Sequence, residues 1–405
     1  MCHPKCGSIE RAIGADVNKS VQSGISSNAG AESAVVGRDS PESESSSAKR
    51  PTISVILPNY NHGKWLSRAV EALVAQAVSS MEIVLIDDGS TDNSLEVIAE
   101  LCRHHDCIRL VEHGVNRGPY VAVRSGLAVA RGEFLLLAAA DDFILPGLLE
   151  HAEAALRAYP DAAFFCSEVA LVNRSGRVMS YRPVVPPRLA SGYMSPDDVR
   201  REIQHTDNWF VGPSVVYRHA RIAEIGYFDE SLGTLCDGLA TRLLAFRHGF
   251  YFDAGVLAVW MVDPMSLSSQ TSLSVTESCR VRDVGARWIA DRFPADVRDD
   301  YAEIFGRRFR FSMARQRIFW RSQPIDPDAI CGLLEWGPRE RSLVRIICRL
   351  PRIGPTLLLI FMTLRMRPVS MMALLKGWWR LHVTQRRERA ALQRRLTEAC
   401  DANVA

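Results

Sequence analysis

The chain reads SVILPNYN at residues 54–61, VLIDDGS at 84–90 and LLLAAADD at 135–142. Each segment is an apolar run of strand length that ends abruptly in polar or acidic residues. In an open α/β sheet the ligand lies outside the carboxyl ends of the strands, so we expect the three endings to converge on one crevice. That crevice would be acidic, and gathered carboxylates suit a divalent cation that in turn suits a diphosphate.

Strand-like and helix-like patterns alternate around these segments. The predicted strands begin with the run at Ile53 and continue over 82–86, 108–112, 133–139, 162–172, 210–217 and 251–261. The predicted helices lie over 65–77, from 91 to 101, and over 120–130, 145–159 and 237–248. Because the strand at 133–139 is apolar throughout, it indicates burial on both faces, as in a parallel sheet.

Composition limits the classes of function. The chain has 405 residues and a net charge of +3, which is too small to imply a polyanionic partner, and no nucleic-acid-binding module is recognisable. Its ten cysteines include no CxxC pair, which favours reduced thiols and a cytoplasmic protein over a disulfide scaffold. The Cys/His clusters at 2–6 and 102–107 are weak candidates for a metal site.

The chain divides into three parts. Residues 1–50 are rich in Ser, Gly, Ala and Glu and are predicted to be a disordered tail, because they cannot bury enough apolar surface. Residues 51–274 carry the strand and helix pattern, and residues 275–405 are helical and Arg-rich. No signal peptide is visible. The longest apolar stretch, 356–364, is far below the roughly 18 to 20 residues that span a bilayer.

Several motifs together resemble the family 2 glycosyltransferases. Over roughly residues 52–270 they occur in the family's order: PNYNHGKWL, IDDGSTDNS, Asn116 to Gly118, ARGEFLLLAAADD followed by Leu145-Pro146, and GYFDESL before Asp237. The resemblance implies the GT-A nucleotide-sugar fold, an α/β fold with a mostly parallel central sheet, here followed by a helical C-terminal region. It also implies an inverting hexosyltransferase that takes its sugar from a nucleotide-sugar, with a UDP-sugar as the expected donor.

The first two motifs would hold the donor. A carboxylate at a strand end can accept a hydrogen bond from a nucleobase imide N–H, and in the resembled family the acids matching Asp87 and Asp88 bind uracil or ribose. Pro58, Asn59 and Tyr60 would frame the same base. The alternative is that residues 87–90 merely form a turn and cap a helix.

A second donor-contacting loop is implied at Asn116 and Arg117. Arg117 would meet the base or a phosphate oxygen, although a solvated arginine is an equal alternative.

Asp141 and Asp142 are the expected metal ligands. By resemblance they would contact the ribose and coordinate Mg²⁺ or Mn²⁺ on the diphosphate, with Asp141 also counted among the donor-binding residues. The family usually carries Asp-x-Asp here, and Ala139 replaces the first acid of that stretch. Hard cations keep several waters, so one or two carboxylates can suffice. The alternative is a carboxylate pair that caps the helix beginning near Leu145.

Asp237 is the expected general base. The family places a Glu-Asp pair at a helix start here, and this chain reads Cys236-Asp237. Direct displacement with Asp237 as base would invert the anomeric carbon. Asp237 could instead be a plain N-cap. Trp209 and Phe210 are weaker candidates for an apolar platform under the acceptor sugar, with a place in the core as the alternative.

The C-terminal region mixes the aliphatic run 357–362 with Arg365, Arg367 and the pair Trp378-Trp379. This pattern suits a helix in an anionic membrane interface, or equally a helical cap on the catalytic domain. The implied partners are a nucleotide-sugar donor and a glycan or lipid-linked acceptor, with possible peripheral membrane contact and no nucleic acid. The implied setting is cytoplasmic assembly of a cell-surface polysaccharide, at the inner face of the membrane.

Three other functions are alternatives to glycosyl transfer. A nucleotide-sugar-binding protein without catalysis is suggested by Ala139 and Cys236 together. A nucleotidyltransferase usually needs a basic, Gly-rich phosphate loop after its first strand, and residues 58–63 lack one. A dinucleotide oxidoreductase is weaker still, because no GxGxxG follows a strand.

Overall fold

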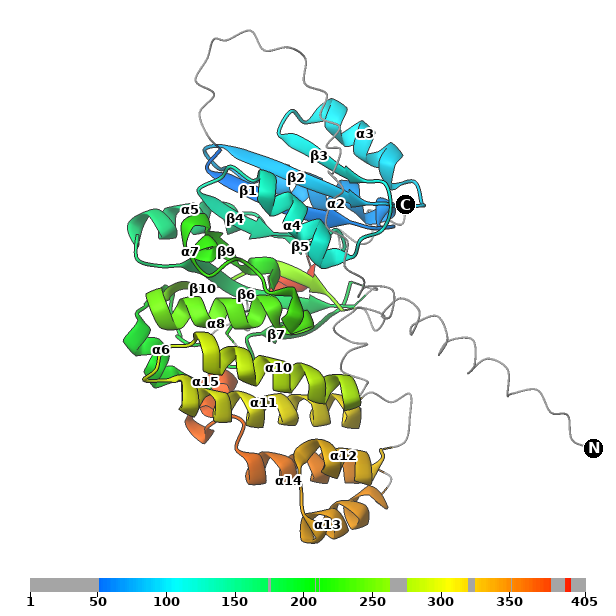
Figure 1. The fold of residues 1–405 in the computed structure, drawn as a ribbon, viewed down its shortest axis with the longest axis vertical. Coiled ribbons are helices and arrows are strands. Elements are labelled where there is room, and N and C mark those ends of the chain that lie inside the picture. The colour runs from blue at the N-terminus through cyan, green and yellow to red at the C-terminus, as the bar shows by residue number, and fades with distance from the viewer. Residues whose placement is uncertain are drawn as a thin grey trace, which may run out of the picture. The chain divides into compact units, whose positions relative to one another are not determined.

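A computed structural model describes residues 51–173, 176–207, 209–210, 212–262, 275–319, 325–350, 352–379 and 390–394 (Figure 1). Within these ranges ten strands form a mixed sheet in the order β3-β2-β1-β4-β9-β6-β10-β5, with β7 beside β6 and β8 beside β10. The strands are β1 (Ile53–Asn59), β2 (Met81–Asp88), β3 (Ile108–His113), β4 (Phe134–Leu137), β5 (Phe143–Ile144), β6 (Phe164–Val172), β7 (Val178–Arg182), β8 (Gly192–Met194), β9 (Val216–Arg218) and β10 (Phe250–Met261).

The parallel part of the sheet brings the predicted strand ends together. β1 lies between β2 and β4 and is parallel to both, while β3 is parallel to β2. Asn59 lies opposite Asp87, Asp88 lies opposite His113, and Ile56 lies opposite Leu137. The side-by-side, parallel arrangement of β1, β2 and β4 expected from the sequence is therefore confirmed, whereas the common crevice stays a prediction. The antiparallel pairs are formed by β5, β7, β8 and β9.

Helices cover both faces of this sheet (Figure 1). Along β1, Val55 and Leu57 pack in one buried cluster and Ile56 packs in the other, because successive side chains point to opposite faces. The first cluster contains residues of α2 (Gly63–Val74), α3 (Ser94–His104) and α5 (Leu148–Ala158). The second contains residues of α4 (Pro119–Val129), α6 (Pro196–Ile203), α7 (His219–Glu224) and α8 (Cys236–His248). Burial on both faces explains the uninterrupted apolar strands.

The C-terminal residues form further helices. These are α10 (Val275–Arg292), α11 (Arg298–Phe319), α12 (Pro327–Leu334), α13 (Pro338–Cys348), α14 (Gly354–Met366) and α15 (Met371–Trp379). Trp288, Ile289 and Tyr301 belong to the same buried cluster as α8, so α10 and α11 share a core with the sheet. The division at residue 275 therefore remains a prediction, and the predicted tail at 1–50 lies outside the described residues. No helix in the described ranges is both long and apolar enough to cross a bilayer.

Several predicted boundaries are wrong. The strand expected over 210–217 is only Val216–Arg218, because Gly212–Ser214 form a 3-10 helix in which the Ser214 hydroxyl donates to the Ser167 carbonyl (3.0 Å). The strand expected over 133–139 is limited to Phe134–Leu137.

Two predicted helices also begin later than expected. The helix predicted from residue 145 begins at Leu148, because Phe143–Ile144 pair with β10 and Gly147 at φ 94° precedes the first turn. The helix predicted from Thr91-Asp92 begins at Ser94, since the Asp92 carboxylate accepts the Ser94 amide (3.0 Å) instead of capping from the first position.

The close approach of α4 to the sheet yields a stability prediction. A Cβ added at Gly126 would lie 2.7 Å from methyl groups of Ile56 and Ile86, whereas one added at Gly306 in α11 would meet nothing within 4 Å. We expect Gly126→Ala to lower the free energy of unfolding by about 1–3 kcal/mol through overpacking. Gly306→Ala should raise it by up to ~1 kcal/mol through helix propensity. Urea unfolding of both variants checks this, and equal shifts would contradict the predicted contact.

Candidate active site

Asp87 ties the ends of β1 and β2 together. Its carboxylate is buried and accepts hydrogen bonds from Asn59 Nδ2 (2.9 Å), the Ser90 amide (2.9 Å) and the Ser90 hydroxyl (2.6 Å). The loop is closed by Asn61, whose Oδ1 accepts the Thr91 amide (2.7 Å). Because Asn59 Nδ2 donates to Asp87, the amide orientation is fixed and Oδ1 faces elsewhere. That buried Oδ1 has no hydrogen-bond partner in the described part of the chain.

Asp88 holds the loop that follows β3. Its buried carboxylate accepts from the amides of Arg117 (2.9 Å) and Gly118 (2.8 Å) and from His113 Nδ1 (2.7 Å). Since a carboxylate only accepts, the His113 proton sits on Nδ1, and Nε2 can accept from the Ser125 hydroxyl at 3.0 Å. Sequence reasoning missed His113, although it stands at a strand end like the acids beside it.

The other predicted donor residues lie nearer the surface. Tyr60 is 41% exposed, and Pro58 is half-buried at the end of β1. Asn116 and Arg117 are exposed on the loop that Asp88 fixes. The Asn116 Oδ1 also accepts the Gly118 amide (2.9 Å), so the Asn116 side chain adds to the order of this loop.

Asp141 and Asp142 follow β4 in a tight loop. Asp142 Oδ1 accepts the Met261 amide at the end of β10 (2.8 Å). Burial, together with the neighbouring charge of Asp141, raises the pKa of the Asp142 carboxyl well above its usual range. The alternative of a helix cap is not formed, because α5 has Gly147 as its N-cap. No set of three or more His, Cys, Asp or Glu that could hold a metal occurs in the described ranges, the 102–107 cluster included.

Asp237 lies in the first turn of α8. Its Oδ1 accepts the Gly238 amide (2.7 Å), and the helix N-cap is Leu235, so Asp237 is not the N-cap. Burial raises the pKa of the Asp237 carboxyl, while the Gly238 N–H and the Arg242 guanidinium oppose the shift. Burial and the charge of Asp237 also raise the pKa of the Cys236 thiol to about 12.

Asp237 opens into a cleft of about 770 Å³. The cleft is bordered by α4, by Leu137 at the end of β4 and by the segment from 226 to 237, and its polar lining residues include Tyr120, Arg124, His219, Tyr227, Asp229, Glu230, Cys236 and Asp237. Burial raises the pKa of Tyr120 to about 12, with Cys236 and Asp237 adding to the shift. Because the loop carrying Asp141 and Asp142 follows Leu137 directly, β4 connects the cleft to the acidic strand ends.

Comparison with known proteins decides the family. Residues 54–211 match the model of glycosyl transferase family 2. This chain carries a family 2 glycosyltransferase domain. The matched residues include β1, β2, β4 and the loops that hold Asp87, Asp88, Asp141 and Asp142, so the resemblance is confirmed for the motifs up to residue 211. The GYFDESL motif and Asp237 lie beyond the match.

Curated relatives of this glycosyltransferase domain match over short segments. The glycosyltransferase GlyG of Streptococcus pneumoniae is 36% identical over 98 residues, which are 24% of this chain and 33% of that protein. Chondroitin synthase of Escherichia coli is 32% identical over 108 residues, which are 26% of this chain and 16% of the synthase. The chain thus spans only about a third of the length of GlyG.

Solved structures agree on the fold. Residues 1–349 of S. aureus TarS, crystallised with UDP-GlcNAc, superpose with a TM-score of 0.54 and 19% identity, covering 78% of this chain and 91% of that one. At that identity the likeness concerns the fold, and it confirms the predicted GT-A architecture.

The predicted acceptor platform is wrong for Trp209. Its side chain is fully buried, stacks on Phe250 (ring centroids 5.9 Å apart) and meets Phe210 edge-on (5.7 Å). Phe210 is partly buried against Phe164 (5.1 Å), and the Arg242 guanidinium lies 5.7 Å from its ring centroid. Trp209 is therefore a core residue of the glycosyltransferase domain, which was the alternative expected for an aromatic residue of this kind.

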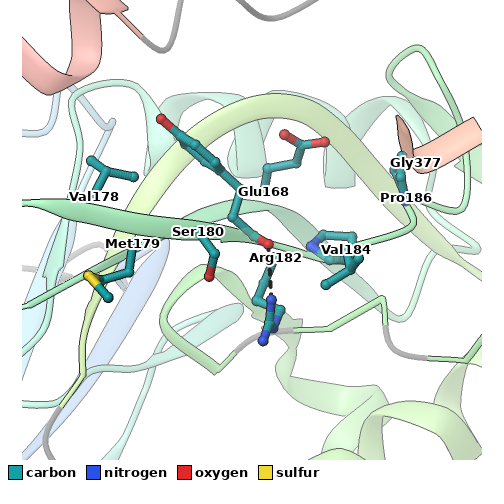
Figure 2. Close-up of a pocket in the computed structure, with 10 residues that line it drawn as sticks. Glu168, Val178, Met179, Ser180, Arg182, Val184, Pro186 and Gly377 are labelled. Atoms are coloured by element: carbon teal, nitrogen blue, oxygen red, sulfur yellow. Dashed lines mark hydrogen bonds between the residues drawn. The ribbon is translucent and has the colours of Figure 1, made fainter. Parts of the chain in front are cut away.

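A second cavity, of about 260 Å³, lies between β7 and α15 (Figure 2). Glu168, Arg182, Val184 and Gly377 are among its lining residues, and Figure 2 shows the Glu168 and Arg182 side chains pointing in opposite directions. Burial and the neighbouring charge of Arg315 lower the pKa of Arg182 to about 10. This cavity shares no lining residue with the cleft at Asp237, and nothing in the sequence pattern indicated it.

The contacts of Asp88 predict how the loop depends on it. In Asp88→Asn the amides of Arg117 and Gly118 lose a charged acceptor, so we expect faster hydrogen exchange at these amides and a loss of about 2–3 kcal/mol in unfolding free energy. Exchange measured by mass spectrometry over 114–118, with urea unfolding, tests both. Asp106→Asn, at an exposed turn, serves as the control. Unchanged exchange at 117 and 118 would show that the loop is held by other contacts.

Proposed function

We propose that this protein is an inverting glycosyltransferase that moves a sugar from a nucleotide-sugar, expected to be a UDP-sugar, to a hydroxyl of a glycan or lipid-linked acceptor. The observation that carries the proposal is the adjacency of two features in a family 2 domain. The ends of β1, β2 and β4 lie side by side, and the cleft holding Asp237 begins at the end of β4.

The donor base is assigned to the end of β1. The buried Asn59 Oδ1 needs a hydrogen-bond donor, and a nucleobase imide N–H would supply one. Asp87 acts here as a positioning residue, because it engages Asn59 Nδ2 and so leaves Oδ1 as the free acceptor for the base. Pro58 and Tyr60 would border the base.

The loop after β3, which carries Asn116 and Arg117, is assigned to the part of the donor beyond the base. Asp88 fixes the backbone at Arg117 and Gly118, and the exposed Asn116 and Arg117 side chains would reach the donor from there. A guanidinium pairs well with phosphate oxygens.

Asp141 and Asp142 fit a hard divalent cation. Two adjacent carboxylates repel each other, and the raised pKa of Asp142 is a sign of that repulsion and of burial. One or two carboxylates are enough for Mg²⁺ or Mn²⁺ when the diphosphate and waters complete the coordination. When bound, the ion would neutralise charge on the diphosphate leaving group. The Met261 amide holds the Asp142 carboxylate in place.

Asp237 would take the proton from the acceptor hydroxyl. A raised pKa makes its carboxylate a stronger base, and it remains ionised near neutral pH as long as its pKa stays below the working pH. Cys236, with a pKa of about 12, stays a neutral thiol and cannot replace the missing glutamate as a second acid-base group. Attack of the activated hydroxyl on the face opposite the diphosphate inverts the anomeric carbon.

The biological setting follows the family resemblance. We place the enzyme in the cytoplasm, at the inner face of the membrane, in the assembly of a cell-surface polysaccharide. The rival is a nucleotide-sugar-binding protein without catalysis, favoured by Ala139 and Cys236. A panel of sugar nucleotides with Mn²⁺ or Mg²⁺, scored by nucleotide release, separates the two. A binding protein would be protected from heat by UDP and Mn²⁺ but would release no nucleotide.

Asp237→Asn tests the assignment of the base. We expect turnover to fall by at least ~100-fold, since a general base contributes that much or more, while heat protection by UDP is retained. In the wild type, kcat/KM should rise with pH through the raised pKa of Asp237 and then level off, because only the ionised form accepts a proton. Asp299→Asn, at a side chain that is 90% exposed, is the control. Normal turnover in Asp237→Asn would assign the base elsewhere.

Asp141→Ala tests the metal assignment. Turnover should fall to near background, and the additional heat protection that Mn²⁺ gives with UDP should disappear while protection by UDP alone remains. The physical reason is that the ion loses one of its two carboxylate ligands, while Asp142 keeps its hydrogen bond from the Met261 amide. Isothermal titration with UDP, with and without Mn²⁺, measures the loss of metal-dependent binding independently of activity. Full metal-dependent binding in the variant would remove Asp141 from the ligand set.

A further inference from the structure

Seven aliphatic side chains stand exposed along α13, the following turn and α14. They recur at alternating spacings of three and four residues: Leu343, Ile346, Leu350, Ile353, Leu357, Ile360 and Leu364. Their exposed fractions run from 37% at Leu357 to 67% at Leu364. We call these residues the apolar stripe. Single exposed aliphatic residues are ordinary, but seven of them on two helices that pack together and on the turn between them mark an interaction surface.

The stripe is not needed to hold the two helices in place. Val344 and Ile347 of α13, with Leu358 and Met362 of α14, are buried in a cluster that also contains residues of α11 and α12. In Figure 1 these helices (orange) pack beside one another and against α12. One side of α13 and α14 is therefore buried against neighbouring helices, and the stripe is left on another side. A helical cap on the catalytic domain stays a prediction.

Along the chain the charges around the stripe are almost all positive, and Arg341 and Arg345 of α13 pair with Asp328 of α12. Glu340 is the only acid between residues 339 and 379. Arg349 and Arg352 flank Leu350 in the turn, and Arg367 follows Leu364; all three are exposed, and no carboxylate in the described ranges pairs with them. Arg365, near the end of α14, is paired with Glu340 at 3.5 Å.

We infer that the apolar stripe and its arginines dock on the surface of a bilayer that carries anionic headgroups. Aliphatic side chains would enter the interface while the arginines reach the phosphates. A second copy of this chain is a poorer occupant, because it would bring unpaired arginines against arginines. On α15, Trp378 and Trp379 are 56% and 51% exposed, and tryptophan is enriched at membrane interfaces.

The use of such a surface rests on the proposed glycosyl transfer. An enzyme whose acceptor is carried on a lipid gains from being held at the membrane, where its substrate is concentrated. The surface itself is argued from exposure and charge, so vesicle binding and nucleotide release can fail independently of each other.

Flotation of the full chain with vesicles tests the inference. We expect binding to phosphatidylcholine vesicles containing phosphatidylglycerol, weak binding to phosphatidylcholine alone, and a loss of binding as salt rises. Ile346→Glu with Ile360→Glu should weaken binding by at least about tenfold, because two inserted aliphatic side chains are lost. Arg349→Gln with Arg352→Gln should weaken it by roughly fivefold for each arginine and reduce the salt dependence.

A matched control is the double variant Leu95→Glu and Leu110→Glu, which changes side chains that are each 39% exposed on α3 and β3. It should bind vesicles like the wild type. Equal heat protection by UDP in all variants shows that they are folded. No flotation of the wild type, or equal losses in the control and stripe variants, would overturn the inference. Concentration-dependent dimers that Ile346→Glu abolishes, without flotation, would assign the stripe to self-association instead.

Discussion

Two adjacent buried carboxylates at the end of β2 hold together the strand ends to which we assign the donor. Asp87 reaches across to β1 through Asn59, and Asp88 reaches across to the loop after β3 through Arg117, Gly118 and His113. Hydrogen bonds to a charged acceptor are stronger than neutral ones, and a buried carboxylate without them would be very costly. Asp87 and Asp88, which the sequence indicated as direct donor ligands, therefore hold the ends of β1, β2 and β3 together.

The Asp237 carboxylate is also largely buried, but it accepts fewer hydrogen bonds than Asp87 and Asp88 do. It has one short hydrogen bond, from Gly238, and shares its surroundings with Cys236 and Tyr120, whose pKa values are raised with it. Arg242 limits the shift without forming a direct ion pair with Asp237 in the described residues. A carboxylate kept this sparsely solvated is a better base than one in water. The acids that we propose to hold the donor and the acid that we propose as the base thus lie in different environments, which β4 connects.

The C-terminal helices belong to two different buried clusters. α10 and α11 share the core of the sheet, whereas α12, α13 and α14 form a separate cluster with part of α11. The sequence pattern allowed either a membrane-facing helix or a helical cap. In the structure α13 and α14 have one side buried against neighbouring helices and an exposed, basic side, which we propose as a docking surface.

The sequence by itself determined which segments form β1, β2 and β4 and indicated the family, because uninterrupted apolar runs with sharp polar endings are local properties of the chain. The start of α6 is likewise a local matter, since the Ser195 and Asp198 capping box forms between near neighbours. Tertiary structure decided that Trp209 is core, because Phe250 covers it from a distant strand. It also decided that His113 supports Asp88 and that the stripe on α13 and α14 stays uncovered. Burial and exposure depend on which remote segments pack together, and no local pattern records that.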